Sequence, residues 1–226
     1  MRKKLVVIVA LILIVVSMTV ALSACVYTKE HTYATDLDKL QEKFGEYYFF
    51  DIDKEQFEFK QCGYVTFNNQ DMWGNEVEVE IEQWNMVYHP YGITDYEIIP
   101  DSFLDKITQI RVTCEIRFSS RHDFVGDTIE EYVNANHDIY VTRLFDGDID
   151  DVRCMILKHG WLHSDRAKSA TAIVALFWID KIMYEIEFQA SLADETHIET
   201  MVFAQATPIV ESAIYSRYKG KDRKTN

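Results

Sequence analysis

The sequence contains little proline or glycine, and it lacks an excess of positive charge. Only 3 of its 226 residues are Pro and 8 are Gly, while 48% are hydrophobic. These values exclude collagen-like, low-complexity and fully disordered chains. The formal net charge of −14 argues against nucleic acid as a partner, because DNA and RNA attract basic surfaces. We therefore expect a globular protein with no nucleic-acid partner.

Motifs of common cofactor and catalytic sites are missing as well. No two glycines form the Gly-x-Gly pattern of phosphate-binding loops, and no Gly-x-Ser-x-Gly sequence is present. The 4 cysteines contain no Cys-x-x-Cys pair, which zinc sites and redox centres use. The sequence therefore predicts no cofactor and no metal ion, and it favours a protein that is not an enzyme.

A targeting signal occupies the N-terminus. Three basic residues at positions 2–4 precede an uncharged run over residues 5–24, which is long enough to cross a bilayer as a helix. The run ends in Leu22-Ser23-Ala24-Cys25, an aliphatic residue, two small residues and a cysteine. In this order, these features resemble the precursor of a bacterial lipoprotein, in which such a lipobox precedes the lipidated cysteine.

The resemblance implies cleavage between Ala24 and Cys25 and a thioether-linked lipid on Cys25. Residues 1–24 would then be a lipoprotein signal peptide, and residues 25–35 the lipidated cysteine with a tether. The remaining chain would be held by its lipid on the outer face of the cell membrane. An uncleaved signal anchor is the alternative, and it also places the chain outside the cytoplasm. Whether the envelope has one membrane or two stays open.

Charge is unevenly distributed along the mature chain. Removal of residues 1–24 takes away three positive charges and changes the net charge from −14 to −17. Residues 217–226 hold five basic side chains and one acidic one. We expect this segment to be a basic, disordered tail. A contact with anionic lipid or wall polymer is the alternative.

Three cysteines remain when Cys25 is lipidated. Cys62, Cys114 and Cys154 cannot all pair within one chain, because their number is odd. Cys114 and Cys154 are in phase with apolar neighbours two residues away, which indicates inward-facing strand positions. We expect buried free thiols, and one disulfide with a leftover thiol is the alternative.

Hydrophobic periodicity predicts an α+β fold. Period-two alternation predicts strands over residues 76–82, 107–118, 152–158 and 182–189. Residues 57–68, rich in Phe, Tyr and Val, and residues 139–145 are further predicted strands, and residues 170–179 are apolar on both faces, as in a central strand. Helical spacing predicts helices over residues 34–49, 101–106, 127–134 and 194–216. Thr35 or Asp36 and Asp127 or Thr128 are expected as N-caps. Pro208 predicts a kink or break in the last helix.

We therefore expect a single domain over residues 36–216, preceded by the N-terminal signal helix. Its largely antiparallel sheet of six or seven strands would be covered by helices on one face. The strand–turn–strand–helix ending is loosely similar to that of PsbP-like and Mog1-like modules. This likeness implies an architecture and no functional site.

Two segments resemble metal sites without matching them. His159 and His163 have the spacing of zinc ligands on a helix, but Gly160 replaces the catalytic glutamate and disfavours a helix. The acidic run over residues 146–151 has the alternating carboxylates of a calcium loop. Such a loop needs glycine at its sixth position and a bidentate glutamate at its twelfth, where this chain has Asp151 and Leu157. A loop with solvated histidines and an exposed acidic turn are the expected structures.

The leading hypothesis is a non-enzymatic lipoprotein that binds a protein or a cell-wall component. Trp73 is a candidate partner contact, because it lies at the expected tip of the hairpin between residues 57 and 82. The alternative is an enzyme or small-ligand binder whose site assembles only in three dimensions. For an enzyme, the candidates are His122, His137 and the segment from His159 to His163. The sequence does not identify the ligand or the oligomeric state.

Overall fold

The computed structural model describes residues 27–70, 76–93, 99–117, 128–135, 137, 139–159, 170–194 and 196–222. Several predicted features lie outside these residues: the signal peptide with Ala24 and Cys25, the hairpin tip with Trp73, and the residues His122 and His163. In the described part of the chain, no helix is both long enough and apolar enough to cross a membrane.

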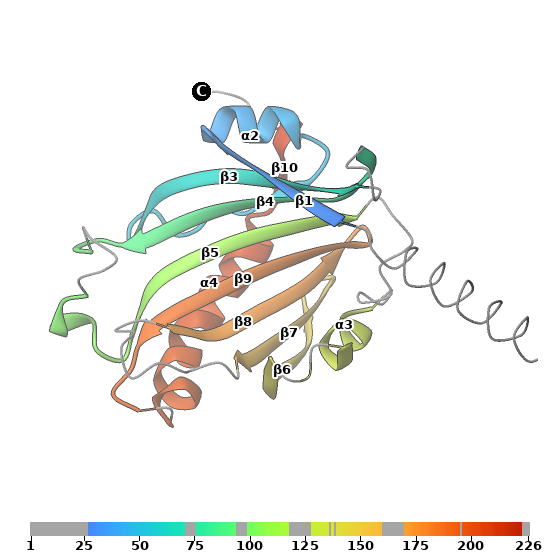
Figure 1. The fold of residues 1–226 in the computed structure, drawn as a ribbon. Coiled ribbons are helices and arrows are strands. Elements are labelled where there is room, and N and C mark those ends of the chain that lie inside the picture. The colour runs from blue at the N-terminus through green and yellow to red at the C-terminus, as the bar shows by residue number, and fades with distance from the viewer. Residues whose placement is uncertain are drawn as a thin grey trace, which may run out of the picture.

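The domain is built on one antiparallel sheet of eight strands (Figure 1), in the order β1-β3-β4-β5-β9-β8-β7-β6. The strands are β1 (Tyr27–Thr35), β3 (Phe57–Gln70), β4 (Glu76–Pro90), β5 (Lys106–Arg117), β6 (Tyr140–Ile149), β7 (Val152–His159), β8 (Ala170–Ile179) and β9 (Ile182–Ser191). Two short strands, β2 (Tyr48–Phe49) and β10 (Tyr218–Lys219), pair separately. The predicted α+β class, the largely antiparallel sheet and the single domain are confirmed.

Helices lie on both faces of this sheet. Figure 1 shows α4 (Phe203–Tyr215) crossing behind the strands and α3 (Ile129–Ala135) beside β7 and β6 at the lower right, and the core contacts of α3 lie on the other face from those of α4. A π-helix (Ile198–Val202) runs directly into α4, and a short 3-10 helix covers Asp101–Phe103. Helix α2 (Leu37–Lys43) packs its Leu40 into the same core as α4. The expectation that helices cover one face holds for α2 and α4 and is wrong for α3.

The position of α3 follows from strands that are apolar on both faces. On β7, Cys154 and Ile156 face the main core under α4, whereas Met155 and Leu157 face a second cluster under α3. Strand β8 alternates in the same way, so this half of the sheet buries apolar side chains on each side. A second helix is needed to cover the second apolar surface, and α3 does so with Ile129 and other apolar side chains.

Local signals predicted two helix caps and one turn, but not every element end: the helix expected over residues 34–49 is α2, which ends at Lys43, and the strand expected over residues 76–82 continues to Pro90. Asp36 Oδ1 accepts a hydrogen bond from the backbone N–H of Lys39 at 2.8 Å and caps α2. Thr128 Oγ1 accepts one from Glu131 N at 3.2 Å at the start of α3. Asp180 and Lys181 both adopt positive φ, of 54° and 67°, in the predicted hairpin turn between β8 and β9.

Pro208 neither ends nor breaks the last helix. It lies inside α4, which continues to Tyr215. A proline removes the hydrogen bond to the carbonyl four residues earlier, here that of Ala204. Both Pro208 and Ala204 are exposed, so water can satisfy this carbonyl.

Both ends of the domain are more ordered than predicted. The expected tether is in fact β1, which pairs with β3 along its whole length. The expected tail begins with β10 and a 3-10 helix over Gly220–Asp222. Arg217 forms ion pairs with Asp150 and Asp151 in the turn between β6 and β7, at 3.2 and 2.5 Å. The prediction of disorder from residue 217 is therefore wrong for residues 217–222. Backbone pairing and ion pairs, which charge counting cannot detect, hold both segments.

Candidate functional site

The sheet face opposite α4 carries polar and ionisable side chains on three adjacent strands. The pairing register places Asn85 of β4 beside Thr113 of β5, and Thr113 beside Glu185 of β9. One rung further along, Arg111 of β5 pairs with Glu187 of β9. Here this surface is called the polar face, and it comprises Gln83, Asn85, Arg111, Thr113, Glu115, Glu185 and Glu187.

An open cavity of about 410 Å³ lies over most of the polar face. All of the polar-face residues except Glu115 contribute to its lining, together with residues of β1 and β3 such as Thr32 and Gly63. The lining therefore offers amides, hydroxyls, a guanidinium and carboxylates within one concave site. Its volume is in the range of small-molecule sites.

Glu187 is held by side chains from three strands. Arg111 Nη1 lies 3.4 Å from one carboxylate oxygen of Glu187. The other oxygen accepts hydrogen bonds from Thr171 Oγ1 and, at 3.2 Å, from Gln189 Nε2. These donors hold the carboxylate of Glu187 in one position, and the contact with Arg111 is charge-assisted.

Glu185 lies in a different electrostatic environment. Burial raises its pKa from the usual 4.5 to about 7, and repulsion from Glu187 and Glu115 contributes to the increase. Attraction to Arg111 and a hydrogen bond with Tyr140 oppose this increase in the pKa. Near neutral pH, Glu185 therefore exists in both protonation states. It can donate a hydrogen bond to a ligand when protonated and accept one when ionised.

Aromatic side chains lie beside this carboxylate. The ring of Tyr140 on β6 is 6.0 Å from that of Tyr132 on α3 and 6.4 Å from that of His159 at the end of β7. Burial lowers the pKa of His159, and the charge of Glu187 opposes this effect. His159 therefore interacts electrostatically with Glu187. It is the last residue of β7, so the prediction that it lies in a loop is wrong.

The other predicted enzyme candidates do not join this site in the described residues. His137 lies in the turn after α3, where its Nδ1 is 3.3 Å from the carbonyl oxygen of Asn134. His122 and His163 are outside the described residues, so their role stays a prediction. Among the candidate histidines within the described residues, His159 is the one whose pKa is affected by the charge of a polar-face carboxylate, Glu187.

The acidic run over residues 146–151 is only partly the expected turn: it belongs to β6 up to Ile149, residues 150–151 form the turn, and arginines pair with its carboxylates. Asp146 forms ion pairs with Arg143 and Arg153, while Asp150 and Asp151 contact Arg217. In the part of the chain that the structure describes, no group of three or more His, Cys, Asp or Glu is placed to hold a metal ion.

Ser216 and Lys219 have the Ser-x-x-Lys spacing of some serine nucleophiles. Ser216 Oγ donates to the carbonyl of Asp51 at 3.2 Å. Lys219 Nζ lies 3.6 Å from Asp180 and 5.0 Å from the ring centroid of Tyr48. The two side chains therefore make separate contacts, and these do not form a nucleophile–base pair.

The three described cysteines are buried free thiols, as predicted. Burial raises the pKa of Cys62 to about 11 and that of Cys154 to about 12, and it raises the pKa of Cys114 as well. Cys114 and Cys154 lie in the main core, on the side of the sheet opposite the polar face. These thiols are poor nucleophiles, because only the thiolate reacts.

Sequence reasoning missed the polar face as a site. The outward positions of Arg111, Thr113 and Glu115 were predictable from alternation within β5, as were those of Glu185 and Glu187 in β9. The adjacency of β4, β5 and β9 was not predictable from that alternation. The available signal was the run of polar residues on the outward face of two predicted strands, over residues 111–115 and 185–187.

The fold and this site define a single-domain α+β protein with an open polar cavity on one face of its sheet. No protein-family model, curated protein or solved structure matched the chain. The likeness to PsbP-like and Mog1-like modules therefore stays a prediction.

Proposed function

We propose that this protein is a lipid-anchored, extracytoplasmic binding protein without catalytic activity. Its polar face would hold a ligand rich in hydroxyl and amine groups, such as a fragment of the cell wall. The observation that carries the proposal is the cavity of about 410 Å³ lined by Asn85, Arg111, Thr113 and the two glutamates of β9.

The chemistry of the lining supports this class of ligand. Side-chain amides such as that of Asn85 both donate and accept hydrogen bonds, whereas carboxylates accept them. A sugar hydroxyl can donate to a carboxylate and accept from an amide at the same time. The carboxylates of Glu115, Glu185 and Glu187 outnumber the single guanidinium of Arg111 on the polar face. An amine on the ligand would balance this negative charge.

The proposed anchor is Cys25, in its lipobox. Strand β1 begins at Tyr27, two residues later. Two extended residues span at most about 7 Å, so a lipid on Cys25 would hold the sheet edge near the membrane surface. The net charge of the mature chain, −17, would oppose deeper contact with anionic headgroups.

Binding can be measured by isothermal titration calorimetry on the full chain purified from membranes in detergent. The probes are soluble fragments of enzymatically digested peptidoglycan and, as a simple amine-bearing sugar, glucosamine. We expect binding by the wild type and a loss of about tenfold in affinity for Asn85→Leu, which removes a hydrogen-bonding amide. Glu42→Gln, an exposed change on α2, is the matched control. Equal affinity of wild type and Asn85→Leu would reject the polar face as the site.

One observation favours an enzyme as the second candidate. A carboxyl group with a pKa near 7 can act as an acid or base at neutral pH, and Glu185 on the polar face has this character. Chromatography of the same peptidoglycan fragments after incubation separates the two functions. New products that disappear with Glu185→Gln would indicate an enzyme, and unchanged fragments support a binding protein.

A further inference from the structure

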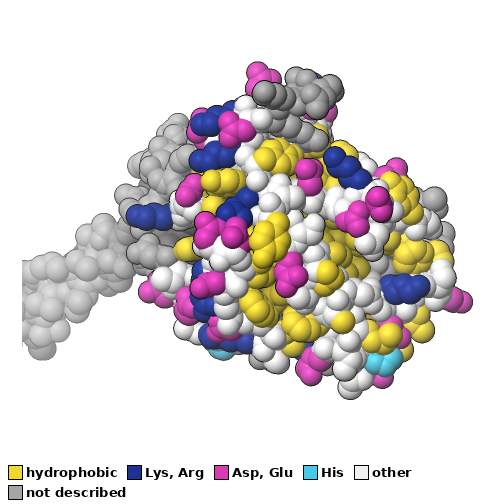
Figure 2. All heavy atoms as spheres, turned by 180° about the vertical axis from the view of Figure 1, so that it is seen from behind, with side chains coloured by type: hydrophobic (Ala, Val, Ile, Leu, Met, Phe, Trp, Pro, Cys, Tyr) yellow, Lys and Arg dark blue, Asp and Glu magenta, His cyan; other side chains and the backbone are white. Residues whose placement is uncertain are grey.

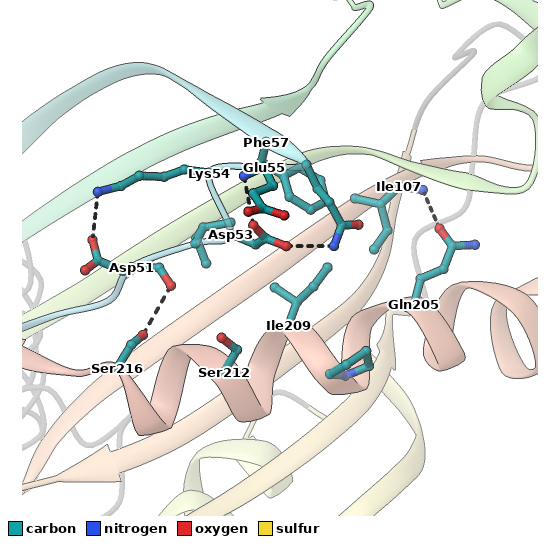
Figure 3. Close-up of a pocket in the computed structure, with 13 residues that line it drawn as sticks. Asp51, Asp53, Lys54, Glu55, Phe57, Ile107, Gln205, Ile209, Ser212 and Ser216 are labelled. Carbon is teal, nitrogen blue, oxygen red and sulfur yellow. Dashed lines mark hydrogen bonds and ion pairs between the residues drawn. The ribbon is translucent and has the colours of Figure 1, made fainter.

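A second concave surface lies on the other side of the sheet, along α4. Figure 3 shows the segment over residues 51–57 facing α4 across a cavity of about 680 Å³. Phe57, Ile107 and Ile209 supply apolar lining, and the carboxylates of Asp51, Asp53 and Glu55 lie on the side formed by the segment over residues 51–57, across from α4. Here this surface is called the α4 groove. Figure 2, which views the α4 side, shows hydrophobic side chains open to solvent among acidic ones.

Hydrogen bonds fix the wall of the groove. Asp53 caps its own turn, since its Oδ1 accepts from Glu55 N at 2.8 Å and its carbonyl accepts from Phe57 N at 2.9 Å. Ser216 Oγ of the segment after α4 donates to the carbonyl of Asp51 at 3.2 Å. Tyr91 Oη donates to the carbonyl of Lys54 at 3.0 Å. A wall held in this way costs a ligand little conformational entropy on binding.

The opposite wall is one face of α4. Gln205, Ile209, Ser212 and Ser216 recur at intervals of three or four residues, so they point to the same side of the helix or its end. The backbone N–H of Ile107 donates a hydrogen bond of 3.3 Å to Gln205 Oε1, which holds this side chain in place. The groove therefore lies between two rigid elements, with an apolar side chain near its centre.

The rim of the α4 groove is negatively charged. The groove lining contains three carboxylates, those of Asp51, Asp53 and Glu55, and one cation, Lys54, whose Nζ lies 3.9 Å from Asp51. The mature chain has a net charge of −17, so a second copy would be repelled, as would an anionic membrane surface. A positively charged occupant complements this rim.

Exposed aromatic side chains extend the surface beyond the groove. An adjoining cavity of about 300 Å³ shares Phe57 with the groove and adds Glu58, Phe59 and Tyr91. Tyr91 is 55% exposed and Phe59 is 37% exposed, although both are large apolar residues. Aromatic rings beside carboxylates attract Lys and Arg side chains through their negatively charged faces.

We propose that the α4 groove binds an extended peptide segment of a protein partner, in which basic and apolar side chains alternate. The apolar side chains contact Phe57, Ile107 and Ile209, and the basic ones contact the carboxylates of the rim and the ring of Tyr91. This surface is separate from the polar face and takes a different class of ligand. The inference therefore does not depend on the ligand proposed for the polar face.

Fluorescence polarisation with labelled synthetic peptides tests the inference on the full chain in detergent. The probes are a Lys-Leu alternating peptide, a Glu-Leu peptide of equal length, and a Lys-Ser peptide that keeps the charge without the apolar groups. We expect the Lys-Leu peptide to bind at least about tenfold more tightly than either of the others, and more weakly at high salt.

Two pairs of variants locate the binding. Glu55→Lys reverses an exposed rim charge, whereas Glu211→Lys makes the same change in net charge on α4 outside the groove lining. Ser212→Trp fills the groove, and Tyr215→Trp adds an indole at an exposed position of α4 that does not line it. We expect losses of at least about tenfold for Glu55→Lys and Ser212→Trp only.

The inference is overturned if the Lys-Ser or Glu-Leu peptide binds as tightly as the Lys-Leu peptide. It is also overturned if each variant and its control lose the same affinity, because the effect would then come from net charge alone. Loss of peptide binding in Asn85→Leu would move the peptide to the polar face and equally reject the α4 groove. All of the substituted groove positions are exposed, so the variants are expected to stay folded.

Discussion

Glu185 illustrates how neighbouring strands change the chemistry of one residue. It lies on β9 with Glu187 two positions away on the same face, and Glu115 lies on the adjacent strand β5. In an unfolded chain these carboxyl groups would ionise independently near pH 4.5. In the folded protein the pKa of Glu185 is about 7. Between about pH 4.5 and 7, the Glu185 side chain therefore binds a proton in the folded state that it releases on unfolding.

This difference predicts the pH dependence of a variant. Between about pH 4.5 and 7 the folded state binds more protons at Glu185 than the unfolded state, so the wild type loses stability as the pH rises. We expect Glu185→Gln to unfold like the wild type at pH 4.5 and to be more stable at pH 8, by at most about 3 kcal/mol. Urea denaturation at both pH values measures the difference, with Glu42→Gln as control. The prediction would be contradicted if the difference in the free energy of unfolding between Glu185→Gln and the wild type were the same at both pH values.

The cysteines show how far single residues could be predicted. Alternation with apolar neighbours indicated that Cys114 and Cys154 face the core, and both are completely buried. Period two is a local property of a strand, so it can be read without knowing the strand's neighbours. Cys62 carried no such signal. Its burial arises because β1 and α2 cover this part of β3, where Cys62 Sγ lies 3.3 Å from the carbonyl of Thr35.

At the scale of elements, long-range contacts hold the segments at both ends of the domain. Gly63 allows β1 to approach β3, because a Cβ there would lie 2.8 Å from the carbonyl oxygen of Tyr33. Gly220 plays the same role near the C-terminus, where a Cβ would lie 2.7 Å from the carbonyl oxygen of Gln41 and 2.9 Å from the ring of Phe49. The backbone after α4 is therefore packed against α2 and β2.

Gly220→Ala tests whether this C-terminal segment is part of the fold. We expect a loss of about 1–3 kcal/mol in the free energy of unfolding, because the new methyl group meets a backbone oxygen that cannot move freely. Lys221→Ala is the control, since it removes an exposed ion pair with Glu46 that is worth little. Urea denaturation compares the two variants. A Gly220→Ala protein as stable as the wild type would restore the interpretation of a disordered tail.

At the scale of the whole molecule, the two proposed binding surfaces lie on opposite sides of one sheet. The polar face lies opposite α4, and the α4 groove lies along it. Two partners could therefore bind at the same time without competing for the same side chains. The proposed anchor point, Cys25, precedes the edge strand β1, so a lipid there would hold one edge of the sheet toward the membrane.

Lipidation itself is tested by metabolic labelling. We expect radiolabelled palmitate to enter the wild-type chain and the control Cys62→Ala, and not Cys25→Ser, because Cys25 supplies the sulfur that carries the lipid. The mass of the mature chain should correspond to loss of residues 1–24. Absence of label from the wild type would contradict a lipid anchor, and an unlabelled chain that retains residues 1–24 would indicate an uncleaved signal anchor.

Local periodicity and capping were sufficient to predict the α+β class, most strand and helix positions, and the inward direction of the core residues. These features depend on residues that are close in the sequence. Examples are the capping of Lys39 N–H by Asp36 and the hairpin turn at Asp180 and Lys181. Only the tertiary structure decided which strands become neighbours. Asn85, Thr113 and Glu185 are far apart in the chain, and they form one surface because β4, β5 and β9 pair side by side. Strand pairing over such separations depends on the packing of the whole sheet, so local patterns gave the outward direction of these side chains but not their assembly into one surface.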